Sequence, residues 1–166
     1  NIDDIYPLMN EIIERKNRVI SVKSIEGDVI ENMPSKRFEK YKAFVNIMYG
    51  CDKFCTYCIV PYTRGKQRSR KVEDIVKEVE GLKAKGYKEV TLLGQNVNSY
   101  LREENRKGIK IEEYEGVNSF ATLLRAINKI EGIERIRFVS PHPKDFTDDV
   151  IQAIAECDKV CKLVHL

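Results

Sequence analysis

Three cysteines lie in one short loop of this 166-residue chain, and their spacing is the strongest chemical signal in the sequence. Cys51, Cys55 and Cys58 follow the pattern C-x3-C-x2-C, directly after a largely apolar run at residues 43–48. A loop this short can turn three thiolates toward a common point. Structural zinc and iron–sulfur sites use four protein ligands, so a set of three leaves one metal position free, as catalytic metal sites do.

Two other interpretations of the three thiols are open at this point. Zinc accepts three cysteines and one histidine, and His142 or His165 would then be the fourth ligand. Alternatively, the thiols would be unrelated members of a hydrophobic core. Asp52, Lys53 and Thr56 lie between the cysteines and make the loop polar, which argues against a core position.

The composition is typical of a soluble globular protein. Hydrophobic residues make up 42% and charged residues 33% of the sequence, which excludes an intrinsically disordered chain. No apolar run is long enough to span a bilayer and no signal-peptide pattern is present, so we expect a cytoplasmic protein. The five cysteines are an odd number with three in one loop, which indicates reduced thiols or metal ligands rather than disulfides.

Basic residues cluster directly after the cysteine loop. The net charge of +3 is too small to indicate a nucleic-acid partner by itself, but its distribution is uneven. No acidic residue interrupts the basic segment, and Tyr62 lies beside it. The segment would suit contacts with the phosphates of an RNA stem-loop, although the same pattern is common on hydrated surfaces, and Arg64 could instead approach a carboxylate. Its members are Arg64, Lys66, Arg68, Arg70 and Lys71.

The first part of the chain is predicted to differ from the rest. Apolar residues at three- and four-residue steps predict a helix over residues 5–13. Residues 18–22 have the pattern of a strand, and residues 29–30 could form a short partner strand after a turn. Residues 32–42 are polar, contain a proline and predict a linker.

After the linker, the sequence predicts an α/β fold in which strands and helices alternate. The expected strands are near-continuous apolar runs, which favours parallel pairing through right-handed crossovers. Four parallel strands could form an open sheet or part of a barrel, and periodicity does not choose between them. We expect strands at 43–48, 90–93, 136–139 and 162–166, and helices at 72–82, at 120–130 and after Thr147.

With Tyr57 in its last gap, the cysteine motif C-x3-C-x-aromatic-C resembles the signature of the radical S-adenosylmethionine (radical SAM) superfamily. Other segments resemble the MiaB family of tRNA methylthiotransferases, and the match runs nearly end to end. The Gly-Gln-Asn-Val-Asn-Ser run favours this family over sister families that modify threonylcarbamoyl-adenosine or a ribosomal protein. The segments are Tyr49-Gly50-Cys51, residues 59–65, residues 94–100 and Ser140-Pro141-His142-Pro143.

The resemblance implies a fold and a domain organisation. Radical SAM enzymes of this kind use a six-stranded partial (βα) barrel, of which this chain would carry the first half and end after about four strands. Residues 1–36 would be the tail of an amino-terminal methylthiotransferase domain together with a linker. Residues 37–166 would be a partial radical SAM domain.

The resemblance also assigns roles to the cysteine loop. Cys51, Cys55 and Cys58 would ligate three irons of a [4Fe–4S] cluster, whose fourth iron binds the amino and carboxylate groups of S-adenosylmethionine. Electron transfer to the sulfonium would break the C5′–S bond and release a 5′-deoxyadenosyl radical. Tyr57 would pack near the adenine, or else be an ordinary half-buried tyrosine that covers the loop. No catalytic residue is expected beyond the cluster ligands.

Two further segments are expected at the same site because active sites of parallel βα folds gather at the carboxyl ends of the strands. By resemblance, Gly94, Gln95 and Asn96 would hold the methionine part of the cofactor, and the glycine would allow close backbone approach. A plain strand-end turn is the alternative. Ser140 and His142 would line the site, although a lone histidine often has a structural role.

The function implied by the resemblance is transfer of a methylthio group to C2 of N6-isopentenyladenosine next to the tRNA anticodon. The full-length enzyme would need a second, auxiliary iron–sulfur cluster. Its partners would be an electron donor protein and the tRNA anticodon stem-loop, and no membrane contact is expected. Arg64, Lys66, Arg68 and Arg70 would contact the RNA. This part of the chain alone is expected to be inactive. The alternatives are a zinc-containing or metal-free RNA-binding module and a sister methylthiotransferase with another substrate.

Two patterns in the second half are open to more than one interpretation. Cys157 and Cys161 have a spacing that suits a metal pair, but cysteine also behaves as a small buried hydrophobe, which we favour here. Arg135 and Arg137 alternate with apolar residues, so one face of that strand is charged. The sequence does not indicate which face points inward.

Overall fold

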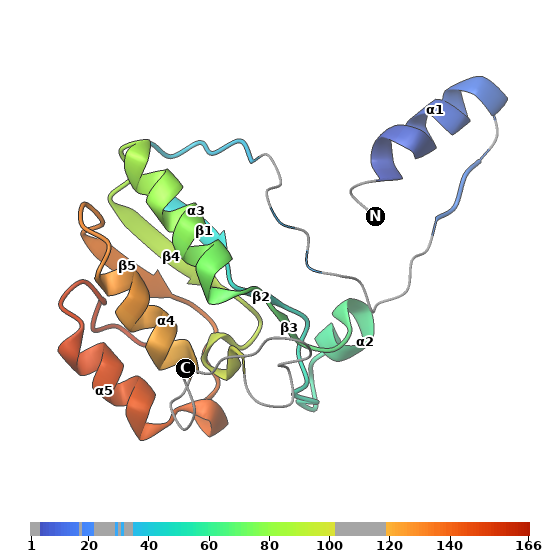
Figure 1. The fold of residues 1–166 in the computed structure, drawn as a ribbon. Coiled ribbons are helices and arrows are strands. Elements are labelled where there is room, and N and C mark those ends of the chain that lie inside the picture. Colours follow the sequence, from blue (N-terminus) through green and yellow to red (C-terminus); the bar gives the residue numbers. More distant parts are fainter. Residues whose placement is uncertain (1–3, 17, 22–28, 30, 32–34, 102–118) are drawn as a thin grey trace.

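The structure is a computed structural model that describes residues 4–16, 18–21, 29, 31, 35–101 and 119–166 (Figure 1). The first element, α1 (Ile5–Arg15), stands apart from the remaining elements and buries no side chain. Its amphipathic pattern predicted the helix correctly. Apolar residues such as Met9 and Ile13 remain exposed on it.

The strand predicted after α1 is absent from the residues that the structure describes there. Residues 18–21 and residue 29 form no strand, while Val22 and Ile30 lie outside the described residues. An isolated two-stranded hairpin has little stability in water without a packed face. The described part of the short apolar run, residues 18–21, is therefore not in a strand.

A three-stranded parallel sheet forms the centre of the fold. Its strand order is β1-β4-β5, with Val45 beside Leu92 and Leu92 beside Phe138. Helices separate the successive strands of this sheet along the chain, as the alternation of patterns predicted. The strands are β1 (Lys42–Asn46), β4 (Glu89–Leu93) and β5 (Arg135–Phe138).

Three helices cover one face of this sheet (Figure 1). They are α3 (Val72–Ala84), α4 (Ser119–Asn128) and α5 (Asp148–Glu156). Val45, Leu92 and Phe138 point toward them and belong to the buried core. The opposite face carries the half-exposed Phe44 and the Arg137 side chain. This mixed α/β fold with parallel strands confirms the predicted fold class, a partial (βα) barrel.

The fourth predicted strand does not form. Ile136 makes one isolated parallel bridge with Val160, through hydrogen bonds to the backbone of Lys159 and Cys161. Residues 162–166 are not in a strand and their side chains are exposed. A strand needs a continuous ladder and a buried face, and this segment has neither beyond the single bridge. Within the described residues, no helix combines the length and apolar character needed to cross a membrane.

The first predicted strand is divided in two, and the second piece carries the cysteine loop. β1 ends at Asn46, and β2 (Met48–Tyr49) pairs antiparallel with β3 (Arg68–Ser69). The loop lies between these two short strands and is followed by α2 (Val60–Arg64). The antiparallel pair therefore brings the two ends of the loop together.

Gly50 closes the turn from β2 into the loop and accepts no side chain. Its φ is +71°, and a Cβ atom there would lie 2.2 Å from the Lys66 carbonyl oxygen. By contrast, Gly81 lies in α3 with no atom within 4 Å of such a Cβ. The two glycines form a matched pair for substitution.

We expect Gly50→Ala to lower the free energy of unfolding by about 2 kcal/mol, because the side chain would meet backbone in a left-handed conformation. Gly81→Ala should raise it by about 0.5–1 kcal/mol, because alanine has the higher helix propensity. Urea denaturation of both variants measures the difference. Equal stability of the two variants would contradict the close packing around Gly50.

Glu89 joins the two arginines of β5 across the sheet. Its carboxylate accepts from Arg135 Nε at 2.8 Å and from Arg137 Nε at 3.1 Å. Burial pushes the pKa of Glu89 upward, but the hydrogen bonds and charges of both arginines outweigh it and bring the pKa below its ordinary value. The charged strand face therefore carries an ion-paired cluster rather than isolated charges.

A lowered pKa in the folded state means that the Glu89 charge stabilises the fold above the ordinary glutamate pKa. This stabilisation is lost as the pH falls through the folded-state pKa. We expect Glu89→Gln to lower the free energy of unfolding by about 1 kcal/mol at neutral pH. Denaturation across a pH series should show the difference from wild type shrinking in acid. A difference of the same size at neutral and acidic pH would contradict this explanation.

Candidate metal and cofactor site

Hydrogen bonds hold the cysteine loop at both ends. The Cys51 N–H donates to the Gly65 carbonyl at 3.1 Å, and the Gln67 N–H donates to the Asp52 carboxylate at 3.1 Å. Within the loop, the Cys58 N–H donates to the Cys55 carbonyl at 2.9 Å and forms a turn. The backbone of the loop is therefore ordered by the protein itself.

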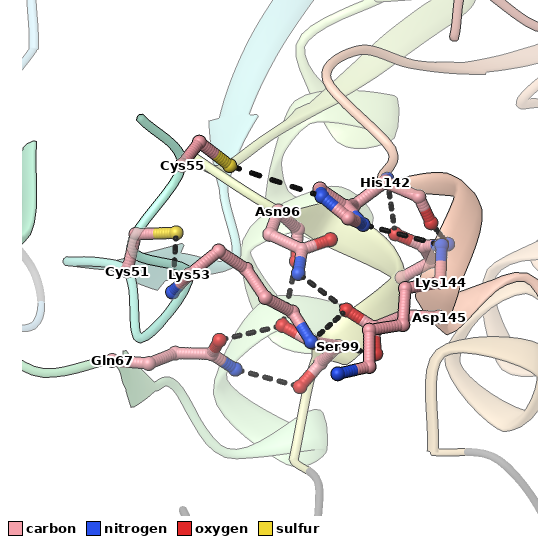
Figure 2. Close-up of polar contacts among 10 residues, drawn as sticks. Cys51, Lys53, Cys55, Gln67, Asn96, Ser99, His142, Lys144 and Asp145 are labelled. Carbon is pink, nitrogen blue, oxygen red and sulfur yellow. Dashed lines mark hydrogen bonds and ion pairs between the residues drawn. The ribbon is translucent and has the colours of Figure 1, made fainter. Parts of the chain in front are cut away.

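The three thiols lie at different depths. Cys51 is only 6% exposed, whereas Cys55 and Cys58 are half-buried. Figure 2 shows the sulfur atoms of Cys51 and Cys55 on the side of the loop that faces His142 and Asn96. Burial raises the pKa of Cys51, the nearby Cys58 and Cys55 thiols raise it further, and a hydrogen bond from the Lys53 N–H partly offsets this. A metal cation beside the three sulfurs would reverse the effect of burial and mutual repulsion.

The three thiols do not form a closed metal site. Among the described residues, no group of three or more His, Cys, Asp or Glu side chains has an arrangement that could hold a metal ion. His142 Nε2 lies 3.9 Å from Cys55 Sγ, and His165 is in the exposed end segment. The zinc arrangement of three cysteines and one histidine is therefore not formed by the described side chains. The donor set itself, three thiols in one loop, suits an iron–sulfur cluster.

The segment after β4 begins with Gly94, which has a packing role in addition to the cofactor contact predicted for it. A Cβ atom at Gly94 would lie 2.5 Å from Cγ of Met48, so the missing side chain makes room for Met48. The short 3-10 helix η2 (Val97–Ser99) follows and is buried. Gly94 is thus required by packing between β4 and β2.

Two amide oxygens in this segment provide an observation that fits a bound cofactor. Asn96 Oδ1 and Gln95 Oε1 are both buried and have no hydrogen-bond partner. The other end of the Asn96 amide donates to Asp145 Oδ2 at 2.6 Å. A buried carbonyl without a donor is costly, and a ligand with an ammonium or hydroxyl group would satisfy it.

The segment after β5 is bonded to the segment after β4. Ser140 has a φ of +60°, and its carbonyl accepts from the Val97 N–H at 3.3 Å. Asn98 Oδ1 accepts from the His142 N–H at 2.8 Å, and Asn98 Nδ2 donates to the His142 carbonyl at 2.9 Å. His142 Nδ1 in turn accepts from the Lys144 N–H at 3.2 Å. The structure thus brings together the cysteine loop and both strand-end segments, as predicted from their positions.

One contact that no sequence pattern predicted links the cysteine loop, the segment after β4 and the segment after β5. Lys53 Nζ of the cysteine loop binds the Asp145 carboxylate, which also accepts from Asn96 (Figure 2). A lysine between two cysteines predicted as metal ligands was a usable signal, because such a charge needs a partner. Its partner lies 92 positions away in the sequence, and no local pattern identifies it.

Tyr57 is 93% exposed, so the interpretation as a half-buried tyrosine covering the loop is wrong. Phe54, Ile59 and Tyr62 are also largely exposed around it, and the Phe54 and Tyr62 rings meet edge to face at 5.7 Å. The loop therefore presents an apolar, aromatic surface. Contact between Tyr57 and an adenine stays a prediction.

The basic segment divides into exposed and buried members. Arg64 and Lys66 are exposed, and Arg68 Nη2 lies 3.4 Å from the Arg64 carbonyl. Arg70 is buried: it donates to Glu31, to Glu78 at 2.7 Å and to the Asn46 carbonyl at 2.7 Å. Burial lowers the pKa of Arg70, but these hydrogen bonds and charges raise it above its ordinary value overall. Arg70 is therefore a structural residue with no surface left for a phosphate, which corrects the prediction for this residue.

Cys157 has the packing of a small hydrophobe. It is buried in the core, and burial, followed by the nearby Glu156 charge, raises the pKa of its thiol. Cys161 is half-buried, and its N–H donates to the Ile136 carbonyl. The core interpretation of Cys157 is confirmed.

Comparison of the sequence with known proteins identifies the family of this chain. The profile of the radical SAM superfamily matches residues 45–166. A tRNA-2-methylthio-N(6)-dimethylallyladenosine synthase of Clostridium botulinum strain Hall is 50% identical over 166 residues, which are 100% of this chain and 35% of that protein. A protein of the same name from Clostridioides difficile strain 630 is 53% identical over 159 residues, 96% of this chain and 31% of its own length. The chain spans about a third of the curated relatives it matches. It belongs to the radical SAM superfamily.

Proposed function

We propose that this chain is part of a tRNA methylthiotransferase that adds a methylthio group to C2 of N6-isopentenyladenosine next to the anticodon. One observation carries the proposal: the three-cysteine loop contacts the β5-end segment, which in turn binds the β4-end segment, in a chain that is 50% identical over its whole length to a synthase of that class. The arrangement combines an open set of metal ligands with polar groups at the carboxyl ends of parallel strands, where such folds place their chemistry.

Each cofactor has a proposed set of residues. Cys51, Cys55 and Cys58 would hold a [4Fe–4S] cluster. S-adenosylmethionine would lie against the two strand-end segments, with Tyr57 available to its adenine. When bound, the two cofactors together supply a 5′-deoxyadenosyl radical. The S-adenosylmethionine contacts would come from Gly94, Gln95, Asn96, Ser140 and His142.

The chain's own contribution is to hold these groups in place. Ser99 Oγ donates to Gln67 Oε1 at 2.5 Å, and Gln67 Nε2 donates to the Ser99 carbonyl at 2.6 Å. The Tyr100 hydroxyl donates to the Arg70 carbonyl at 2.7 Å. These bonds are buried, so they join the β4-end segment to β3 without competition from water. These hydrogen bonds therefore fix the position of the segment that would contact the cofactor.

The remaining parts of the proposal concern the full-length protein. Residues 1–36 would be the end of an amino-terminal methylthiotransferase domain with a linker, and residues 37–166 part of the radical SAM domain. A second, auxiliary iron–sulfur cluster would be held outside this chain. An electron donor protein and the tRNA anticodon stem-loop would be the partners, in the cytoplasm.

The proposed RNA surface is smaller than the basic segment. Arg64 and Lys66 are exposed beside Tyr62, which could stack on a base, while Arg70 is buried. Arg68 is partly exposed and lies between them in the sequence. We assign phosphate contact to Arg64, Lys66 and Arg68.

The cluster assignment is tested by iron and sulfide analysis after anaerobic reconstitution. We expect Cys55→Ala to hold about four fewer irons per chain than wild type, because a cluster held by three thiolates is lost when one is removed. Cys161→Ala is the matched control and should keep the wild-type iron content. Wild type should also release deoxyadenosine from S-adenosylmethionine. A colourless wild-type protein with one tightly bound zinc would instead support a metal-binding module.

The RNA surface is tested by titration with an anticodon stem-loop at several salt concentrations. Arg64→Ala and Lys66→Ala should each weaken binding and reduce the slope of log K against log salt by about 1, because each removes one phosphate contact. Lys88→Ala, at the opposite end of the sheet, should leave both quantities unchanged. Equal effects at positions 64, 66 and 88 would mean that the surface is wrongly placed.

A further inference from the structure

Asp145 is the most deeply buried charged side chain at the site, with 1% of its surface exposed. It ends the short 3-10 helix η4 (Pro143–Asp145), which follows β5. Its two carboxylate oxygens lie 3.0 and 2.9 Å from Lys53 Nζ, and Oδ2 accepts from Asn96 Nδ2 at 2.6 Å. Figure 2 shows the three side chains meeting at the centre of the site.

We propose that Asp145 is a positioning residue that fixes the cysteine loop, through Lys53, against Asn96 of the β4-end segment. This inference rests on the proposed function, because it concerns how the cofactor site is assembled. It assigns no contact between Asp145 and a cofactor. Asp145 acts through Lys53 and Asn96.

The contact with Lys53 controls the placement of a cysteine ligand. Lys53 lies between Cys51 and Cys55, and its backbone N–H lies 3.5 Å from Cys51 Sγ. Its side chain is 20% exposed, so the ion pair with Asp145 is largely shielded from water. A buried carboxylate without its cation is strongly unfavourable, which keeps Lys53 at this place. The pair therefore limits the movement of the residue that touches the Cys51 sulfur.

The contact with Asn96 decides which end of that amide is presented. An ionised carboxylate only accepts hydrogen bonds, so the NH2 group of Asn96 must face Asp145. The carbonyl oxygen then faces the other way, and it is the buried atom that has no hydrogen-bond partner. An acceptor suits the ammonium group of an amino-acid cofactor and not its carboxylate. Asp145 thereby determines that Asn96 offers the ligand a hydrogen-bond acceptor rather than a donor.

The test compares Lys53→Met, Asp145→Asn and the double variant with wild type, in the full-length protein reconstituted anaerobically. Lys88→Met is the control, because Lys88 and Glu134 form an exposed ion pair at 3.2 Å far from the site. Three quantities are measured: iron and sulfide content, the affinity for S-adenosylmethionine at matched iron content, and hydrogen exchange of residues 51–58 without cofactors. Hydrogen exchange reports how firmly the loop is held, and it requires no enzyme activity.

We expect each single variant to weaken S-adenosylmethionine binding by about 10- to 100-fold, the range found for residues that orient metal ligands. The double variant should bind S-adenosylmethionine no more weakly than the more impaired single variant. Both single changes remove the same Lys53–Asp145 interaction, so their effects on affinity should not add. Exchange in the loop should rise in all three, with no change in Lys88→Met. A residue with a merely structural role would lower thermal stability without this specific loss of affinity.

Wild-type affinity and exchange in Lys53→Met would overturn the inference. So would additive losses in the double variant. If Asp145→Asn does not fold, the Lys53→Met comparison alone decides in the same way. Failure of the proposed function would appear separately, because wild type itself would then hold no cluster and bind no S-adenosylmethionine.

Discussion

Parallel pairing of β1, β4 and β5 is the constraint on which the site depends. Because the three strands run in one direction, the chain leaves all of them at the same end of the sheet. The first exit leads to the cysteine loop, the second to Asn96 and the third to Asp145. These groups lie far apart in the sequence and meet only because the register of the sheet is fixed. That register depends in turn on the apolar side chains that pack against α3, α4 and α5.

The elements that sequence patterns predicted well are those whose burial is decided locally. Residues 90–93 are a largely apolar run, and residues 136–139 are apolar except for Arg137; both have strand length and precede an amphipathic helix. Residues 18–21 and 162–166 also contain apolar residues, but within the described part of the chain they form no strand. Local pattern reports which residues favour a strand. Whether a ladder forms depends on what lies alongside, and the pattern does not contain that information.

The same distinction divides the site residues. Spacing alone singled out Cys51, Cys55 and Cys58 as candidate ligands, because ligands of one cluster lie close together in a loop. Arg64 and Arg70 look alike in the sequence, yet one is exposed and the other is buried between Glu31 and Glu78. Glu78 lies only eight positions from Arg70, but Glu31 lies 39 positions away, and no local pattern predicts that both would bind the same arginine. The pairing of Lys53 with Asp145 was missed for this reason.

Two groups at the site, the Cys51 thiol and the Asn96 carbonyl, would each be complemented by a bound ligand, the first by a metal cation and the second by a hydrogen-bond donor. On one side, Cys51 is buried beside two other thiols, so loss of its proton is disfavoured until a cation arrives. On the other side, the buried Asn96 carbonyl lacks a donor. A metal cluster would satisfy the first and an ammonium group the second, and S-adenosylmethionine bound to a free cluster position would bring both to the same place. The Asn96 carbonyl has no hydrogen-bond partner among the described residues, and a buried acceptor left without a donor costs free energy. The proposed cluster and cofactor would together supply a donor to this carbonyl and lower the cost of ionising the Cys51 thiol.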